Sequence, residues 1–182
     1  MKRNTALARS CCALLLGTAL GIPAGWARPP QRDHLTQTEA DKIRDADTTN
    51  DRIRLFLDFA QDRLDRFQRE LRMKGAGPRW ADYLNDLLDA FDSCVEEAAG
   101  RVSDGLHNGE DVRAGIKQVE KRVPEFLKEL EKIRAQGTDL KLYQDALDDA
   151  MDDLRDVIQR AEKADQELQR NPPKRKPHGA LP

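Results

Sequence analysis

The sequence is poor in the residues that build β-sheets and in long hydrophobic runs. Aromatic residues make up 5% of the chain, and valine and isoleucine together number 12. Because strands prefer β-branched and aromatic side chains, this composition disfavours a sheet. Charged residues reach 35% against 38% hydrophobic residues, which is too polar for a protein built of membrane-spanning helices. The sequence therefore predicts a soluble all-α protein.

The only marked apolar run lies at the start of the chain and is short. Three basic residues precede an apolar stretch of about ten residues, Cys11 to Leu20, and Gly25-Trp26-Ala27 then supplies the small residues of a signal peptidase site. A membrane anchor needs roughly 20 apolar residues. We therefore expect a secretory signal at residues 1–27, a periplasmic or extracellular protein, and no transmembrane segment in the mature chain. The alternative is a fortuitously apolar start of a cytosolic protein.

Cysteine is nearly absent once this segment is removed. Cys94 is the only cysteine that remains, so no disulfide can form within the mature chain. The formal net charge moves from −2 to −5, because the signal carries three basic residues and no acidic ones. The remaining Lys and Arg are interleaved with a larger number of acids, which is unlike a surface that neutralises phosphates. We expect packing alone to stabilise the protein, and no nucleic-acid partner.

What the sequence does contain is helical periodicity, with apolar residues at three- and four-residue steps. The predicted long helices span residues 49–73, 79–99, 110–136 and 138–169. A weak, short helix precedes them, beginning with a capping-box pattern at Thr38 and ending near Asp47. Glycines and an asparagine make residues 100–109 the one long loop in this interpretation. Long amphipathic helices with short connections predict an antiparallel four-helix bundle with a short extra N-terminal helix.

The long helices can be grouped into two similar halves. A shift of the chain by 60 residues places Gly77 on Gly137 and Tyr83 on Tyr143, and it aligns apolar positions of the flanking helices. The spacing predicts two αα-hairpins related by duplication. Alternatively, any two amphipathic hairpins of similar length align on their apolar periods. The expected core includes Leu64, Phe67, Leu87, Phe91, Val119, Leu130, Leu147 and Leu154.

These elements divide the chain into four predicted parts. They are the signal peptide at residues 1–27, a lead with the short helix at 28–48, the helical bundle domain at 49–170 and a disordered basic tail at 171–182. The tail begins with Asn171-Pro172-Pro173, and two consecutive prolines stop a helix.

Residues that carry catalysis or bind cofactors are not grouped anywhere in the sequence. His34, His107 and His178 fall in predicted loops or termini, and neither a zinc nor a haem motif occurs. Cys94 lies on the apolar side of its helix, which favours a buried, inert thiol over an intermolecular disulfide. We therefore expect no enzyme activity, cofactor or metal site, and a hydrolase that uses Cys94 is the distant alternative.

A dense row of carboxylates follows the last predicted helix, opposite its apolar face. Its members include Asp145, Asp149, Asp152 and Asp156. A Ca²⁺ site needs oxygens that converge on one point, whereas side chains along a straight helix diverge. A solvated acidic face is therefore the favoured interpretation, and low-affinity divalent-cation binding is the alternative function.

One departure from simple amphipathicity points to a binding surface. On the helix predicted at 49–73, Leu55 and Phe59 project away from the main apolar stripe. Something should cover these side chains. The cover is either the chain's own weak segment around Ile43 or a partner that binds in a groove.

The segments Asp45-Ala46-Asp47-Thr48 and Leu57-Asp58-Phe59-Ala60-Gln61-Asp62-Arg63-Leu64 resemble uncharacterised secreted helical proteins of environmental bacteria. The resemblance implies a bacterial source and brings no activity or site with it. Taken with the residues above, it predicts a secreted or periplasmic helical bundle that acts as a non-enzymatic interaction or structural module. Its partner would be a protein or another envelope component bound through helix faces.

Overall fold

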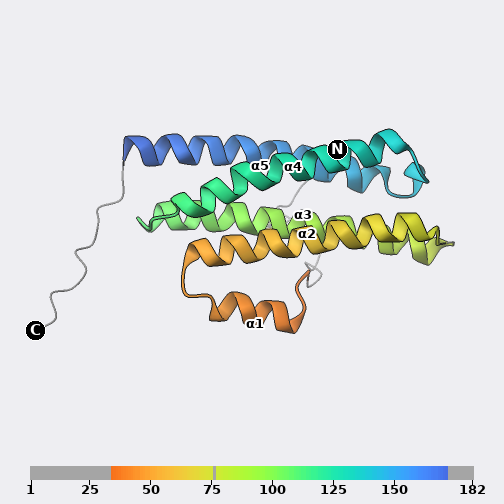
Figure 1. The fold of residues 1–182 in the computed structure, drawn as a ribbon, viewed down its shortest axis with the longest axis horizontal. Coiled ribbons are helices and arrows are strands. Elements are labelled where there is room, and N and C mark those ends of the chain that lie inside the picture. Colours follow the sequence, from red (N-terminus) through yellow and green to blue (C-terminus); the bar gives the residue numbers. More distant parts are fainter. Residues whose placement is uncertain (1–33, 76, 172–182) are drawn as a thin grey trace, which may run out of the picture. The chain divides into compact units, whose positions relative to one another are not determined.

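The described part of the protein is helical throughout. A computed structural model describes residues 34–75 and 77–171, and in these ranges it contains five α-helices and one 3-10 turn but no strand (Figure 1). The elements are α1 (Gln37–Asp45), α2 (Thr49–Met73), α3 (Pro78–His107), α4 (Arg113–Gln136), η1 (Leu140–Leu142) and α5 (Gln144–Arg170). The prediction of an all-α protein is confirmed. The predicted signal peptide at residues 1–27 and the predicted tail beyond Asn171 lie outside the described residues.

The helices pack in a bundle-like array around one core. Helix α2 packs on α3 and α4 packs on α5, while α3 also contacts α5 and α2 also contacts α4. Helix α1 packs against α2. The connection between α2 and α3 and the connection between α4 and α5 lie at the same end of the helices (Figure 1), which we call the turn end. Within residues 34–75 and 77–171, no helix is both long and apolar enough to cross a membrane.

The predicted core positions are all buried. Their exposed fractions range from 0% to 7% at Leu64, Phe67, Leu87, Phe91, Val119, Leu130, Leu147 and Leu154. Two edge-to-face aromatic pairs join the helices, with ring centroids 5.1 Å apart for Phe67 and Tyr143 and 5.5 Å apart for Phe91 and Phe126. Such pairs add specific geometry to the burial of apolar area.

The loop predicted at residues 100–109 is wrong, because α3 continues to His107. Gly105 is buried in this helix, and a Cβ atom added there would lie 2.3 Å from Cγ1 of Val112. The glycine therefore permits a close approach between helix and loop instead of ending the helix. The chain turns after Asn108 at Gly109, whose φ is 68°, so the connection to α4 is shorter than expected.

The start of the last helix also differs from the prediction at Thr138. Asp139 takes a left-handed conformation with φ of 49°, η1 follows, and α5 begins only at Gln144. This turn brings Tyr143 into the core, where its side chain is 1% exposed. Its hydroxyl donates a hydrogen bond of 2.7 Å to the carbonyl oxygen of Thr138. A buried tyrosine needs such a partner, and the irregular turn supplies it.

Candidate functional site on helix α2

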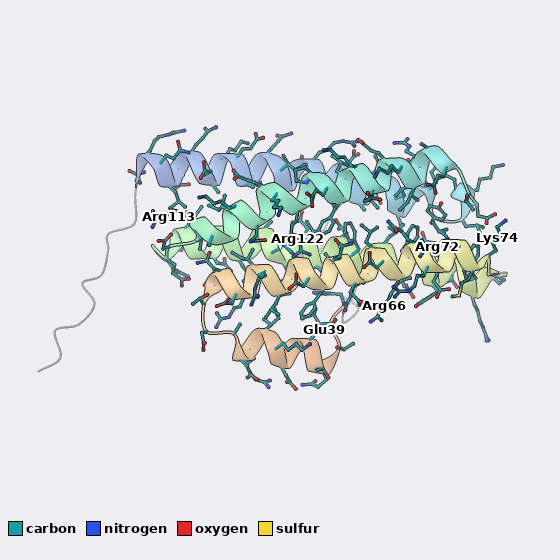
Figure 2. All side chains as sticks on the ribbon, viewed as in Figure 1. Glu39, Arg66, Arg72, Lys74, Arg113 and Arg122 are labelled. Carbon is teal, nitrogen blue, oxygen red and sulfur yellow. The ribbon has the colours of Figure 1, made fainter. Side chains whose placement is uncertain are left out.

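The site begins with the cap of α1, which fixes the position of a carboxylate. Thr36, and not the predicted Thr38, is the N-cap residue. Its side chain accepts a hydrogen bond of 3.3 Å from the backbone N–H of Glu39, and its own backbone N–H donates one of 2.8 Å to Oε2 of Glu39. This reciprocal capping box holds the Glu39 side chain at the first turn of α1. Figure 2 shows Glu39 on the side of α1 that faces α2.

Arg63 on α2 binds this carboxylate with two nitrogen atoms. Its Nη1 lies 2.5 Å from Oε1 of Glu39 and its Nη2 lies 2.6 Å from Oε2. Nη2 also donates a hydrogen bond of 3.0 Å to the carbonyl oxygen of His34. The side chains of Arg63 and Glu39 are only 8% and 13% exposed. A two-point, shielded pair of this kind is among the strongest side-chain interactions, so it forms a latch between α1 and α2.

The pKa values of the two groups reflect the latch. Burial acts to raise the pKa of Glu39, but the hydrogen bonds from Arg63 and Thr36 and the charge of Arg63 outweigh it and hold the pKa at about 2. The hydrogen bond to Glu39 raises the pKa of Arg63, against the opposing effect of burial. The pair is therefore fully charged at neutral pH.

Four residues at three- and four-residue spacing form the face of α2 that carries the latch. They are Arg52, Leu55, Phe59 and Arg63, which we call the α2 stripe. Nη2 of Arg52 donates a hydrogen bond of 3.1 Å to the carbonyl oxygen of Ala46, at the C-terminal end of α1. Since Arg63 binds the start of α1 and Arg52 its end, the stripe is clamped to α1 at both ends.

The two predicted partner-binding residues lie between these clamps. Phe59 is 7% exposed, with the guanidinium carbon of Arg63 5.8 Å from its ring centroid, and Leu55 is half-buried against the core. Ile43 of α1 also packs against the core while remaining partly exposed, and no residue of α1 is fully buried. The chain's own short helix therefore lies along this face, with polar contacts at both of its ends and the partly exposed Ile43 between them.

Replacement of Glu39 by glutamine is expected to loosen α1 without unfolding the other helices. Hydrogen bonds to charged groups contribute about 1.5–3 kcal/mol each, so amide protection across Gln37–Asp45 should fall by roughly tenfold or more in hydrogen exchange.

Acid should also loosen α1 in the native chain. Because the pKa of Glu39 is lowered from 4.5 to about 2, its stabilising effect is complete above pH 4.5 and is lost as the pH falls toward 2.

The matched control lies on the same helix. Asp41 pairs with Arg44 at 2.7 Å, but these side chains are 40% and 69% exposed, and exposed pairs contribute little. Replacement of Asp41 by asparagine should leave the protection of α1 almost unchanged. Equal loss of protection in both variants would contradict a specific latch.

The predicted acidic row does not converge on a point. Asp145, Asp149, Asp152 and Asp156 are all exposed along α5, and Asp152 pairs with Arg155 at 2.5 Å. Across the described ranges, no group of three or more His, Cys, Asp or Glu side chains has the geometry of a metal site. The row is a solvated acidic face of α5 in this structure.

The sequence interpretation missed a carboxyl pair between α3 and α5. One buried oxygen of Asp92 has no hydrogen-bond partner. Burial is the main cause that raises the pKa of Asp92 to about 8, and the neighbouring carboxyl of Asp153 and the charges of Glu96 and Asp89 add to the increase. Asp92 lies next to the apolar positions of α3. Its burial could not be predicted from the helical period of α3 alone, because it also depends on where α5 packs.

Cys94 is placed on the apolar side of α3, as predicted. Its side chain is 0% exposed, and burial raises the pKa of its thiol to about 12. The charge of Arg63 acts in the opposite direction but does not prevent the increase. A thiol in this state holds its proton at neutral pH and is a poor nucleophile.

Comparison with other proteins gives no relative. No family model, curated protein sequence or solved structure matches the chain. The geometry of the α2 stripe and its cover is therefore the basis for a functional proposal.

Proposed function

We propose that the protein is an exported, non-enzymatic interaction module that binds a protein or envelope partner through the α2 stripe. The observation that carries this proposal is the way in which α1 is held against α2. Helix α1 contributes no fully buried residue, and polar contacts at its two ends join it to Arg52 and Arg63, on either side of Leu55 and Phe59. Because a cover held in this way buries little apolar area, its opening costs much less free energy than unfolding of the remaining helices.

The proposed partner would replace α1 by presenting similar chemistry. An amphipathic helix could place apolar side chains on Leu55 and Phe59, as in helix-in-groove recognition. A carboxylate on such a helix would take the place of Glu39 on Arg63, whose other ion-pair partner, Asp62, lies farther away at 3.6 Å. The partner therefore needs both an apolar face and an acidic residue near its N-terminal end, where Glu39 stands in α1.

The scaffold that we propose for the stripe is an antiparallel four-helix bundle of two αα-hairpins, α2–α3 and α4–α5. The packing between the four long helices supports it. Gly77 and Gly137, which are 60 residues apart, both have a positive φ, but Gly77 (ψ 171°) begins α3 whereas Gly137 (ψ 11°) ends α4, so the two turns differ. Tyr83 and Tyr143 have the same spacing but are 42% and 1% exposed. Under this proposal the two hairpins have diverged at the turn.

Export is part of the proposal and rests on the sequence. The basic start, the apolar run and the site after Ala27 are typical of a secretory signal. The resemblance to secreted bacterial proteins favours the same compartment. We propose that the mature chain begins at Arg28 and acts in the periplasm or outside the cell.

Divalent-cation binding by Asp145, Asp149, Asp152 and Asp156, and hydrolysis by Cys94, are not proposed further. The carboxylates point outward along one exposed helix face, and the thiol is buried with a raised pKa. No feature of the described residues favours either function over the interaction module.

Photocrosslinking in the producing cell tests the proposal. A photoreactive amino acid at position 55 or 59 should capture a discrete partner, identified by mass spectrometry together with the N-terminus of the captured chain. The same residue at position 145 or 149, on the exposed acidic face of α5, is the control. Combination with Glu39→Gln should increase capture. Displacement of α1 costs less free energy in this variant, so the partner should bind more tightly.

The positions at which a partner is captured show where the interface lies. Partner capture at positions 55 and 59 that increases with Glu39→Gln supports the α2 stripe as the interface. Capture only at positions 145 and 149 would move the interface to α5. Absence of capture at all four positions would leave a structural role and contradict the proposal.

A further inference from the structure

The connection between α1 and α2 is short and lies at the end of α2 away from the turn end (Figure 1). Only Ala46, Asp47 and Thr48, which we call the hinge, separate the two helices. Ala46 and Thr48 have extended backbone, with ψ of 128° and 156°, and no hinge residue has a positive φ. Extended backbone is open to every residue type. Rotation at the hinge can therefore move α1 away from α2 without passing through a forbidden conformation at either end.

The first residues of α2 are fixed beyond the hinge. Nδ2 of Asn50 donates a hydrogen bond of 2.7 Å to the carbonyl oxygen of Asp111, and Oδ1 of Asn50 accepts one of 2.7 Å from the backbone N–H of Gly115. The hydroxyl of Thr49 donates a hydrogen bond to the carboxylate of Glu110. These bonds join α2 to the start of α4 and to the loop before it, so opening of α1 leaves the four long helices in place.

The segment that contacts the α2 stripe can move as one unit. The capping box holds Glu39 on α1, and the carbonyl oxygen of His34, just before the cap, accepts the second hydrogen bond of Arg63. Leu35 and Ile43 on the same segment pack against the core while remaining partly exposed. A foreign helix that displaced this segment would leave both apolar side chains without a cover, which costs free energy.

We propose that the partner of the α2 stripe is α1 of a second copy of this chain, in a dimer that exchanges the two short helices. This inference rests on the proposed function, because it names the partner of the same site. The proposed partner helix needs an apolar face and an acidic residue near its N-terminal end, and α1 has both in Ile43 and Glu39. Reciprocal exchange covers both stripes and both displaced helices. It keeps the contacts of α1 with the stripe and requires a new backbone conformation only at the hinge.

Reversal of the two latch charges tests this dimer. Sedimentation velocity of the purified full chain, with a reducing agent present, should show dimers that accumulate from micromolar to millimolar concentration. Glu39→Arg and Arg63→Glu each place like charges at the latch, so each variant alone should stay monomeric. Their equimolar mixture should dimerise, since each α1 then meets an opposite charge only on the other chain. It should do so at a concentration at least roughly tenfold lower than the native chain, because closure within one chain no longer competes.

The matched control makes the same charge change on an exposed residue of α1. Asp41, whose side chain is 40% exposed, lies outside the latch, so Asp41→Arg should dimerise as the native chain does. The double variant Glu39→Arg/Arg63→Glu restores opposite charges within each chain and should return to the native behaviour. Circular dichroism checks that the single variants keep the long helices folded. All variants share the same N-terminal segment, so association through that segment would appear in the single variants as well.

The results separate this inference from the proposed function. A native chain that stays monomeric throughout, single variants that dimerise like the native chain, or a monomeric mixture would overturn the exchanged dimer. If photocrosslinking at positions 55 and 59 then captured a different protein, the α2 stripe would remain the interface and only the identity of the partner would be wrong. Capture of a second copy at these positions, together with a dimeric mixture, would support both.

Discussion

Replacement of Phe91 by alanine is expected to lower the free energy of unfolding by about 3–5 kcal/mol. The Phe91 side chain is 0% exposed and packs edge to face on Phe126, with an interplanar angle of 80°. Truncation removes this contact and leaves a cavity that the neighbouring helices cannot fill by small movements, because interiors are densely packed. Urea denaturation followed by circular dichroism measures the difference, and the m-value should stay constant if the transition remains two-state.

Tyr83 provides the control for the loss of an aromatic ring from α3. Its side chain is 42% exposed, and surface substitutions usually change stability by less than about 0.5 kcal/mol. Tyr83→Ala should therefore unfold at nearly the same urea concentration as the native chain. If Phe91→Ala also lost less than about 1 kcal/mol, the helical packing around α3 would have to be loose.

The core was predictable because helical periodicity depends on local spacing alone. Leu64, Phe67, Leu87 and Leu154 were expected inside from their three- and four-residue steps, and all four are buried. Periodicity does not indicate whether a glycine ends a helix or permits close packing within it. Gly105 was interpreted as part of a loop, but its missing side chain admits Val112, a contact that depends on the chain beyond the helix.

Charged residues limited what could be predicted about the candidate site. Leu55 and Phe59 were identified because they are apolar residues outside the main stripe, and the short helix was one of the two expected covers. Arg63 was not identified, because a charged side chain beside Phe59 suggests solvent unless its partner is known. Glu39 is that partner, and it lies 24 residues earlier on another helix. Its place in an S/T-x-x-E capping pattern beginning at Thr36 was the one available signal.

The pair of Asp92 and Asp153 was not predicted for the same reason: each carboxyl group has its partner on another helix. The acidic side chains of α5 were interpreted as one solvated face, but Asp153, which lies on the same helix next to Asp152, is half-buried and interacts with Asp92 of α3. Neither helix alone indicates that two carboxyl groups meet, since their meeting depends on how α3 and α5 cross. Like charges that are forced together are costly to ionise, so this pair has a measurable consequence for stability.

Replacement of Asp92 by asparagine is expected to stabilise the protein at alkaline pH by an amount on the order of a few kcal/mol. The folded chain holds a proton on Asp92 with a pKa of about 8, mainly because of burial, whereas the ordinary value is 3.8. The folded state therefore binds more protons than the unfolded state between these values. Its stability should fall as the pH rises from about 4 through about 8, and the full penalty should remain above that range.

Asparagine has nearly the same shape as the protonated carboxyl group and cannot ionise, so this pH dependence should largely disappear in the variant. The groups that face Asp92 are Asp89 and Glu96 on α3 and Asp153 on α5, and Arg160 of α5 is bonded to Glu96. Urea denaturation at several pH values between 5 and 9 measures the effect, with Asp149→Asn on the exposed face of α5 as the control. Parallel pH profiles for the native chain and Asp92→Asn would show that Asp92 is already ionised at neutral pH. The carboxyl pair would then be solvated, and α3 and α5 would have to pack less closely around Asp92 than they do in this structure.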